Sequence, residues 1–310
     1  MPCLFHADYV PSPHHLRPGS ILKERYKVGR ILGEGGFGIT YLGFDQVLEM
    51  TVAIKEYFPL ARCTRNNSAG NEVTVLYGLP GKIFAKGKQK YLYEARILAK
   101  MEKQPAVVDV RDYFEENNTA YIVMEYIEGI TLEDYRTCGD DPQQIRCVSI
   151  EKMLDIFKPV LYALEVIHEN GIIHRDICPA NLILEKTQDA GMRLRLIDFG
   201  CAREAQTPED TQTIILRHGF APIEMYQQGG GQGPWTDIYE ICATLYYSLT
   251  GLIPPMSTNR IVRDEIIPAS KLCSRISPGL ERALMKGLQV RPHRRFKNVR
   301  ELCEILYAKD

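Results

Sequence analysis

The sequence lacks the features that mark secreted, membrane-spanning and metal-stapled proteins. The nine cysteines are an odd number and include no CxxC pair, which argues against a disulfide framework or zinc finger and for a reducing compartment. The first ten residues, MPCLFHADYV, have no basic stretch before an apolar core, so we expect no secretory signal. The longest apolar-rich run, Ile238–Ile253, contains Glu240 and is too short to span a bilayer. We therefore expect a soluble cytoplasmic protein.

An excess of charge of either sign is also missing. Lys and Arg number 38 against 39 Asp and Glu, a formal net charge of −1, so no global field favours nucleic acid or acidic membranes. The basic run RPHRRFKNVR near the C-terminus is interpreted as a solvated edge with one buried arginine. With 45% hydrophobic and 25% charged residues the composition is globular, and 310 residues suffice for one large domain or two lobes.

The first part of the chain has the pattern of a sheet with one helix. β-Branched and aromatic residues are concentrated in five segments, and KGKQKYLYEARILAKME places Leu92, Ala95, Leu98 and Ala99 on one helical face. We predict an α+β protein whose N-terminal lobe, residues 21–128, is a five-stranded antiparallel sheet plus one helix. The expected strands are residues 26–32, 38–45, 50–57, 106–114 and 119–127, and the expected helix is residues 86–102.

Downstream of the sheet the pattern becomes mainly helical, which predicts a C-terminal lobe over residues 129–310. Ser149 is expected to cap the start of one helix and Gly171 to end it. The segment WTDIYEICATLYYSLTG is apolar on nearly all sides, so we predict a buried helix that ends at Gly251. Two amphipathic helices are expected to close the chain, at residues 277–288 and 298–310.

Two segments fall outside this plan. Residues 57–86 hold several Asn, Gly and Pro breakers around the short apolar run VTVLY, which predicts an insertion made of an irregular loop with a small hairpin. Residues 1–20 are rich in Pro and His and are predicted to be a loose lead-in. This lead-in contains four potential metal ligands whose spacing fits no standard metal site: Cys3, His6, His14 and His15.

A glycine-rich turn, GEGGFG at residues 33–38, is followed by strand-like sequence rather than by a helix. A dinucleotide-binding turn should open a helix, whereas a glycine loop between antiparallel strands can cover phosphates with its backbone N–H groups. Lys55 on the third predicted strand could pair with phosphate oxygens, and Glu94 in the predicted helix is well placed to hold it. A solvated strand lysine is the alternative, which the apolar residues before it in VAIKE disfavour.

Three oxygen-bearing side chains follow in the second half of the chain. The tripeptide His174-Arg175-Asp176 is followed by Asn181, and LIDFG supplies Asp198. Phosphoryl transfer needs a carboxylate that accepts the proton of the incoming hydroxyl, and oxygen ligands for Mg²⁺. Asp176 suits the first role, and Asn181 and Asp198 suit the second. Each motif alone is ambiguous, but their common order is not expected by chance.

From about Tyr26 to Leu306 the chain resembles a eukaryotic-type (Hanks-type) protein kinase. The resemblance rests on four motifs that occur in the family's order: GEGGFG, VAIK, HRDxxxxN and DFG. APIE, at residues 221–224, is one residue longer than the family's Ala-Pro-Glu, and RPHRRF resembles its late arginine, so we assign an ion pair between Glu224 and Arg295. KEYFP and GFGITYLGFD are most similar to bacterial serine/threonine kinases. The resemblance implies two lobes with ATP between them, Mg²⁺ (or Mn²⁺) as cofactor, and γ-phosphoryl transfer to Ser/Thr hydroxyls of proteins.

The resemblance also implies a role for each matching residue. Lys55 contacts the α and β phosphates and pairs with Glu94. Asp176 is the catalytic base, and Asn181 and Asp198 hold the metal ion. The expected nucleotide-binding residues are Gly33, Gly35 and Gly38 over the phosphates, Lys55 on the α and β phosphates, Ala53 and Ile183 on the two sides of the adenine ring, Met124 at the gatekeeper position, and Glu125 and Ile127 through their backbones.

Arg175, immediately before the base, suggests control by phosphorylation of the following segment, because a phosphate there could pair with it. This interpretation makes a second copy of the chain a partner for phosphorylation in trans, beside protein substrates that the sequence does not identify. The candidate phosphorylation sites are Thr207, Thr211 and Thr213. The alternative is that these three threonines are ordinary loop residues that are not phosphorylated.

Three departures from the family pattern bear on activity. Cys178 replaces the lysine that serine/threonine kinases place two residues after the base, Thr40 replaces a valine after the glycine loop, and the segment between Lys55 and Glu94 is long. A charge-assisted hydrogen bond is worth roughly 1.5–3 kcal/mol, so losing one slows a reaction about ten- to a hundredfold. Tyrosine kinases also lack that lysine, which leaves the choice between Ser/Thr and Tyr open. Cys178 and Cys201 are either oxidation-sensitive or inert buried thiols.

Two other functions fit part of the sequence. A pseudokinase that binds nucleotide and acts as a scaffold or allosteric partner is one, and the retained lysine, base and metal ligands disfavour it. A small-molecule kinase of the antibiotic-phosphorylating type is the other, and the arginine of HRD and the APIE segment disfavour it. We expect no nucleic-acid partner and no membrane span.

Overall fold

The computed structural model describes the chain as two compact units. The first unit holds the described residues up to Lys103 together with Val108–Ile127, and the second holds Gln104–Val107 and the described residues from Glu128 onward. The described residues are 12–36, 38–60, 62–66, 70–76, 81–100, 103–137, 149–187, 191–198, 203–204, 217–227 and 230–308.

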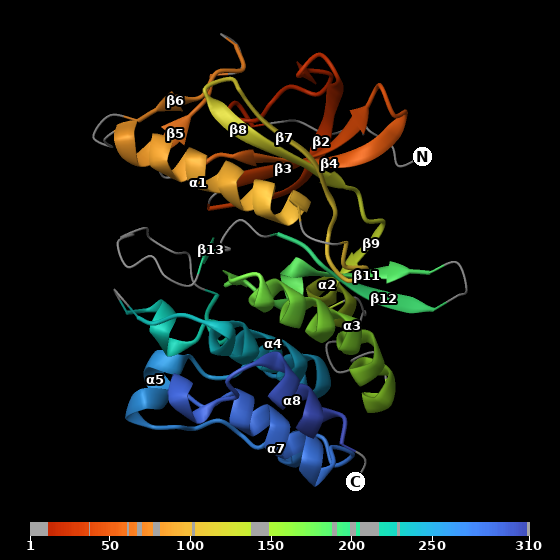
Figure 1. Ribbon diagram of the computed structural model, residues 1–310, viewed down its shortest axis with the longest axis vertical. Helices are drawn as coiled ribbons and strands as arrows, with labels where there is room; N and C mark the ends of the chain where they lie inside the picture. The colour runs from red at the N-terminus through yellow and green to blue at the C-terminus, as the bar shows by residue number, and fades with distance from the viewer. Residues whose placement is uncertain are drawn as a thin grey trace. The chain divides into compact units, whose positions relative to one another are not determined.

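The first unit is built on an antiparallel sheet of strand order β1-β2-β3-β4-β8-β7 (Figure 1). The five predicted strands are present, but the sheet has a sixth, because Lys23 and Glu24 adopt positive φ angles and turn the chain back onto β2. The bounds are β1 Ile21–Leu22, β2 Tyr26–Gly35, β3 Gly38–Asp45, β4 Met50–Tyr57, β7 Val110–Glu116 and β8 Thr119–Glu125.

Strand β7 begins four residues later than predicted. Ala106 and Val107 belong to the second unit, where the Ala106 carbonyl accepts a hydrogen bond from the Leu196 amide at 2.7 Å and Val107 forms a parallel bridge with Leu196. The apolar pattern correctly indicated extended backbone in this segment. Its first residues pair with Leu196, whereas the residues from Val110 onward pair with β8.

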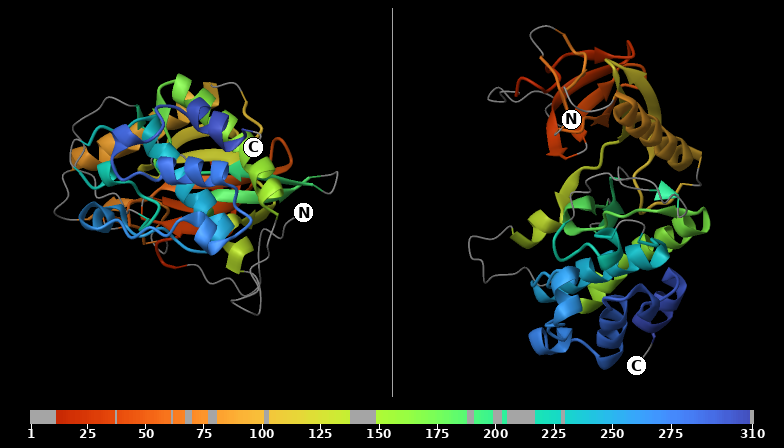
Figure 2. Two further views of the ribbon diagram at one scale, coloured as in Figure 1. Left: turned by 90° about the horizontal axis from the view of Figure 1, so that it is seen from below. Right: turned by 90° about the vertical axis from the view of Figure 1, so that its left-hand side faces the viewer.

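Helix α1, Gly81–Lys100, packs on β7 and β8 (Figures 1 and 2). It begins five residues before the predicted start. Phe84 and Tyr91 lie two turns apart on one face, and both rings pack at a tilt against Tyr57, with centroids 5.3 and 5.5 Å away. This aromatic contact with β4 extends the helix beyond the segment whose periodicity indicated it.

The described part of the insertion forms the small hairpin that was predicted. Strands β5, Cys63–Thr64, and β6, Thr74–Val75, pair antiparallel. The Leu76 amide donates to the Arg62 carbonyl at 2.9 Å and closes the hairpin base.

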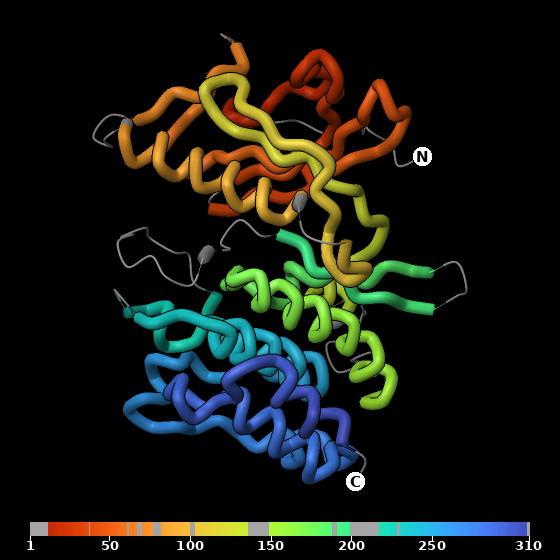
Figure 3. Tube along the Cα trace, viewed as in Figure 1, coloured from red at the N-terminus to blue at the C-terminus, as the bar shows by residue number. Residues whose placement is uncertain are grey.

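In the second unit the two long helices, α3 and α4, contact each other and α8, and α4 also contacts α6 and α7 (Figure 3). Ser149 caps α3 by accepting a hydrogen bond from the Lys152 amide at 3.2 Å, and Gly171 follows its end at φ 76°. Gly251 ends α4 at φ 79°, so these three predicted boundaries are confirmed. The bounds are α2 Leu132–Thr137, α3 Ile150–Glu169, α4 Pro234–Thr250, α5 Ser257–Val262, α6 Ala269–Leu272, α7 Pro278–Gly287 and α8 Val299–Leu306.

Short strands of the second unit carry the loops of interest and were not predicted. Strands β12, β11 and β9 form one antiparallel sheet, and β10 pairs with β13. Among the described helices none is both long and apolar enough to cross a membrane. The bounds are β9 Gly129–Thr131, β10 Ile172–Ile173, β11 Leu182–Lys186, β12 Met192–Leu196 and β13 Arg203–Glu204, with single 3₁₀ turns at Pro179–Asn181, Ile223–Met225 and Pro292–Arg294.

Candidate active site

One face of the first unit's sheet carries the residues expected to contact a nucleotide. Lys55 lies opposite Thr40 on β3, and Thr40 lies opposite Gly33 on β2. Two residues before Lys55, Ala53 lies opposite Met124 on β8. Because directly opposed residues, and residues two apart on one strand, share a face, these side chains point to the same side of the sheet.

The glycine-rich loop contains one glycine that packing requires. A Cβ on Gly38 would collide with the backbone carbonyl of Glu56 on β4, whereas a Cβ on Gly33 or Gly35 would meet no atom within 4 Å. The close approach of the β4 backbone therefore explains why residue 38 is a glycine, but it does not explain the glycines at positions 33 and 35. Gly33 and Gly35 have open space beside them, which leaves room for a ligand near the backbone at both positions.

Lys55 is only 8% exposed, and helix α1 is fixed directly beside it. The Tyr91 hydroxyl donates a hydrogen bond to the Lys55 carbonyl at 3.0 Å. Glu94 follows Tyr91 by three positions on α1, so it lies on the same helical face. This geometry places a carboxylate on the side of α1 that faces the strand carrying Lys55, as the proposed ion pair requires.

The end of β8 constrains how a base could be bound. The Glu125 amide donates to the Asp109 carbonyl at 3.0 Å, and the Glu125 carboxylate accepts from the Asp109 amide at 2.9 Å. Any hydrogen bond from the Glu125 backbone to adenine must therefore use its carbonyl oxygen. Ile127, two residues on, is buried and is the last residue of the first unit.

The opposite face of the same sheet is closed by a buried polar cluster centred on Glu56. The Glu56 carboxylate accepts hydrogen bonds from the Tyr41 hydroxyl at 3.0 Å and the Tyr121 hydroxyl at 2.8 Å, and it forms a fully buried ion pair with Arg65 of the insertion. The insertion therefore supplies a charge that the sheet needs, since an unpaired buried carboxylate is costly.

The residues before β1 are not loose where they are described. The side chain of Leu16 is 1% exposed and its amide donates to the Tyr41 hydroxyl at 3.1 Å. The carbonyl of His14 accepts a hydrogen bond from Arg65 at 3.0 Å. His15 and Leu16 are thus buried in the first unit, and the described part of the lead-in is held by specific contacts, in contrast to the prediction of a loose segment.

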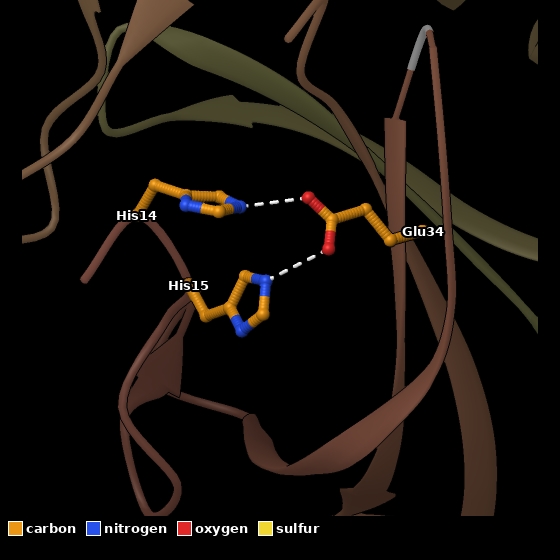
Figure 4. A group of neighbouring side chains, drawn as sticks. All are labelled: His14, His15 and Glu34. Carbon is orange, nitrogen blue, oxygen red and sulfur yellow. Dashed lines mark hydrogen bonds and ion pairs between the residues drawn. The ribbon is translucent and has the colours of Figure 1, made fainter. Parts of the chain in front are cut away.

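Two lead-in histidines meet Glu34 of the glycine-rich loop (Figure 4). His14 Nε2 lies 2.7 Å from one carboxylate oxygen and His15 Nε2 lies 3.1 Å from the other. The Ser12 amide donates to His15 Nδ1 at 3.0 Å, so the ring proton of His15 sits on Nε2 and is donated to Glu34. A metal ligand nitrogen must carry no proton, and this geometry therefore favours a hydrogen-bonded link. Cys3 and His6 lie outside the described residues.

The loop that carries Asp176 is held by its own side chains and by the backbone just after β12. Asn181 Nδ2 donates to the Asp176 carbonyl at 2.8 Å, and the Asn181 carbonyl accepts from the Ile197 amide at 2.9 Å. Arg175 and Asp198 both adopt φ 67°, a conformation that non-glycine residues rarely take. Such strain is typical of functional loops. Ile183, expected beside the adenine ring, lies on β11 opposite Thr131 and Arg195.

The oxygen atoms near this loop fit a hard divalent cation. The hydrogen bond of Asn181 uses its amide nitrogen, which directs the amide oxygen away from the Asp176 carbonyl. An amide oxygen and the Asp198 carboxylate are the ligand types that Mg²⁺ prefers. Phe199, Gly200 and Cys201 lie outside the described residues, as do the candidate phosphorylation sites Thr207, Thr211 and Thr213.

Two buried carboxylates of α4 hold the backbone of this loop. The Asp237 carboxylate accepts from the amides of His174 and Arg175, both at 2.9 Å, and Glu240 accepts from the Ile177 amide at 2.9 Å. The amides on both sides of Asp176 are thereby fixed. The signal that could have revealed this role is the i, i+3 spacing of two acids in an otherwise apolar helix.

The pKa values of the two α4 carboxyl groups are shifted in opposite directions. Burial would raise the pKa of Asp237, but a hydrogen bond from His168 at 2.7 Å and the Arg175 amide outweigh burial and lower it. Burial and the neighbouring negative charge of Asp237 hold the pKa of Glu240 well above its usual range. These opposite shifts favour the charged form of Asp237 and the protonated form of Glu240.

Cys178 and Arg217 both contact the carboxylate of Asp176. The Cys178 thiol donates to Asp176 Oδ1 at 3.9 Å, and Arg217 Nε lies 3.4 Å from the same oxygen. Burial raises the pKa of the Cys178 thiol well above its usual range, and the charge of Asp176 adds to this shift. Cys178 is thus a buried neutral thiol, which matches the inert alternative. Arg217 was not singled out in the sequence.

The predicted ion pair between Glu224 and Arg295 is confirmed. Arg295 Nη1 and Nη2 lie 2.6 and 3.0 Å from the two carboxylate oxygens of Glu224. Arg295 also donates to three backbone carbonyls, and the Thr236 hydroxyl donates to Glu224 at 3.1 Å. The bidentate pair fixes the turn after Arg217 against the C-terminal helices.

Comparisons with known proteins agree on one family. A family model described as "Protein kinase domain" matches residues 26–307. Serine/threonine-protein kinase D of Synechocystis sp. and the serine/threonine-protein kinase PknB of Mycobacterium leprae are 28% and 30% identical over 295 residues, which is 92% and 91% of this chain. The chain spans 52% and 42% of these relatives, about half of their length.

Solved structures show the same architecture. The structure described as "PpkA-294 apo form" matches with a TM-score of 0.77 and 32% identity, covering 94% of this chain and 99% of that chain. The kinase domain of Mycobacterium tuberculosis PknI matches with a TM-score of 0.67 and 22% identity, covering 94% and 98% of the two chains. The second likeness is one of fold alone.

Proposed function

The chain belongs to the protein kinase domain family, and we propose that it is an active kinase that transfers the γ-phosphoryl group of ATP to serine or threonine hydroxyls of proteins. The named relatives are serine/threonine-protein kinases, which supports this choice of acceptor. The small-molecule alternative is disfavoured by the buried Glu224–Arg295 pair, because that pair anchors the APIE segment that belongs to the peptide-substrate platform of protein kinases.

The observation that carries the proposal is the way the Asp176 loop is held. Four residues from His174 to Ile177 have their backbones fixed by side-chain acceptors, two of which are carboxylates of α4. A general base must be held in place to accept a proton at the right moment. A chain kept only as a scaffold has no need of a loop that is fixed on both sides of one carboxylate.

In the proposed reaction the acceptor hydroxyl oxygen attacks the γ-phosphorus. The bond from that phosphorus to the β–γ bridging oxygen breaks, its electron pair leaves with ADP, and the hydroxyl proton passes to the Asp176 carboxylate. Lys55 orients the α and β phosphates, and Glu94 positions Lys55. Asn181 and Asp198 would hold Mg²⁺, which neutralises phosphate charge when it is bound.

The first test measures phosphoryl transfer directly. With labelled ATP, Mg²⁺ and a generic protein substrate, we expect Lys55→Met, Asp176→Asn and Asp198→Ala each to lower transfer by at least about a hundredfold. Asp155→Asn is the matched control, because Asp155 is an exposed residue of α3, and it should retain full activity. Full activity in any of the first three variants would contradict the role given to that residue.

The same samples separate a kinase from a pseudokinase. If wild type and Asp176→Asn transfer equally little while ATP raises the melting temperature of both, the chain binds nucleotide without catalysis. Phosphosite mapping of wild type after incubation with ATP tests autophosphorylation in trans, which we also propose. We expect phosphate on Thr207, Thr211 or Thr213 and none in Asp176→Asn incubated alone.

A further inference from the structure

The carboxylate of Asp176 has a neutral neighbour at the position where serine/threonine kinases carry a lysine. Cys178 is 1% exposed, and its thiol is the donor to Asp176 Oδ1. A buried thiol is a weak donor and brings no positive charge. The positive charge that the lysine would bring to the base and to the transferred phosphoryl group must come from elsewhere or be missing.

Arg217 brings a positive charge to that place from a distant part of the chain. Its Nε lies 3.4 Å from Asp176 Oδ1, the oxygen that Cys178 also contacts. A guanidinium has five N–H donors, and this ion pair uses the one on Nε. The side chain is still 43% exposed, so its terminal nitrogens can reach a phosphoryl group that is presented to Asp176.

The backbone turn that carries Arg217 is fixed by the fold. The Arg217 carbonyl accepts hydrogen bonds from the amides of Phe220 at 3.1 Å and Ala221 at 3.0 Å. Gly219 has φ 87°, and a Cβ there would collide with Ile253 and with the Pro254 carbonyl. The turn is thus packed tightly against the segment after α4, which limits where the Arg217 side chain can go.

Carboxylates surround the Arg217 side chain. Burial would lower the pKa of Arg217, but the negative charges of its neighbours, Asp176, Glu133 and Asp198 among them, raise it. Two of these carboxylates, Asp176 and Asp198, are the groups to which the proposed function gives the base and metal roles. Arg217 therefore stands among the residues that would surround the reacting phosphate.

We propose that Arg217 replaces the missing lysine: it positions the Asp176 carboxylate and donates hydrogen bonds to the phosphoryl group during transfer. This inference rests on the proposed kinase activity. When the β–γ bond breaks, negative charge is spread over the phosphoryl oxygens, and a fixed guanidinium stabilises that charge more than the ground state. Arg217 then compensates for the departure from the family pattern at Cys178.

The test removes the positive charge at position 217 and then restores a positive charge at position 178. Losing one charge-assisted bond in the transition state should lower kcat about ten- to a hundredfold with little change in KM for ATP, so we expect this result for Arg217→Met. Arg217→Lys should retain part of the activity. The double variant Cys178→Lys/Arg217→Met should recover at least tenfold over Arg217→Met, because a lysine two residues after the base returns the charge.

Matched measurements separate this role from a structural one. Arg263→Met is the control, because Arg263 is 84% exposed and pairs only with exposed Glu265 in the described contacts, and it should leave kcat unchanged. Melting temperatures with and without ATP show whether each variant folds and binds nucleotide. Arg217→Lys gives a second form of rescue that leaves the buried Cys178 position untouched.

Three results would overturn the inference. One is wild-type kcat in Arg217→Met. Another is a loss in Arg217→Met that neither Arg217→Lys nor the folded double variant reverses. A wild-type protein without transferase activity would overturn the proposed function, and the inference with it, whereas the first two results leave that function intact.

Discussion

Single buried charges with named partners hold the loops of the second unit in place. Arg295 and Glu224 form a bidentate pair in which both side chains are almost fully buried. Such pairs contribute little net stability compared with apolar residues, but removing one partner leaves an uncompensated charge in the interior. The turn that carries Arg217 therefore depends on a pair more than seventy residues apart in sequence.

Glu224→Gln should lower the free energy of unfolding by about 3–5 kcal/mol, because it leaves the buried Arg295 guanidinium without a countercharge. Urea unfolding at neutral pH measures this. Glu165→Gln is the matched control, since the partner of Glu165 is the 68% exposed Arg300, and it should cost less than about 1 kcal/mol. Equal effects of the two variants would show that the Glu224–Arg295 pair is not important for stability.

At the scale of elements, helix α4 supports the loop that carries Asp176. Its two acids lie three residues apart and accept hydrogen bonds from three loop amides. The pKa of Asp237 is lowered and that of Glu240 is raised, which favours a charged Asp237 and a protonated Glu240. A carboxylic acid whose pKa is raised in the folded state contributes stability below its ordinary pKa. That contribution is lost as the pH rises toward the raised value.

Glu240→Gln should therefore make the protein progressively more stable than wild type as the pH rises above about 4.5. The amide oxygen can still accept the Ile177 hydrogen bond, while the cost of keeping a proton is removed. The difference should grow by at most about 1.4 kcal/mol per pH unit. Denaturant unfolding between pH 5 and pH 8 measures it, and the exposed Glu169→Gln should show no such slope. A pH-independent difference would contradict the protonated state of Glu240.

Elements with strong local patterns were predictable, and the predicted kinase fold is confirmed by the family match and by the solved structures. The ends of α3 and α4 follow from their caps, which are local in sequence. The early start of α1 was missed because Phe84 packs on Tyr57, a contact across the sheet. Arg217 was missed for the same reason: its partner Asp176 is 41 positions away, and no local pattern indicates their contact.

At the scale of the whole molecule, the first unit is a sheet covered on both faces by different parts of the chain. Helix α1 packs on β7 and β8, while the described lead-in and the insertion contribute Leu16 and Arg65 to the cluster around Glu56 and Tyr41. Glu56 follows Lys55 directly on β4, so the polar cluster and the proposed nucleotide face share one strand. The lead-in and the insertion therefore stabilise β4, the strand that carries Lys55 and its proposed phosphate contact.

Leu16→Ala should lower the free energy of unfolding of the first unit by about 2–5 kcal/mol, as expected for truncation of a buried leucine. Leu48→Ala is the control, because Leu48 is 55% exposed, and it should cost less than about 0.5 kcal/mol. Thermal or urea unfolding of the two variants side by side gives the comparison. If Leu16→Ala were as mild as Leu48→Ala, the lead-in would not be part of the core.

The His14–His15–Glu34 link has a practical consequence for anyone who prepares this kinase in the laboratory. The family match begins at Tyr26, and an expression boundary chosen there would discard both imidazoles and leave the Glu34 carboxylate without them. The glycine-rich loop of such a shortened recombinant product would have lost its hydrogen bonds to His14 and His15. Nucleotide affinities or inhibitor rankings measured on it would describe the shortened product rather than the longer chain.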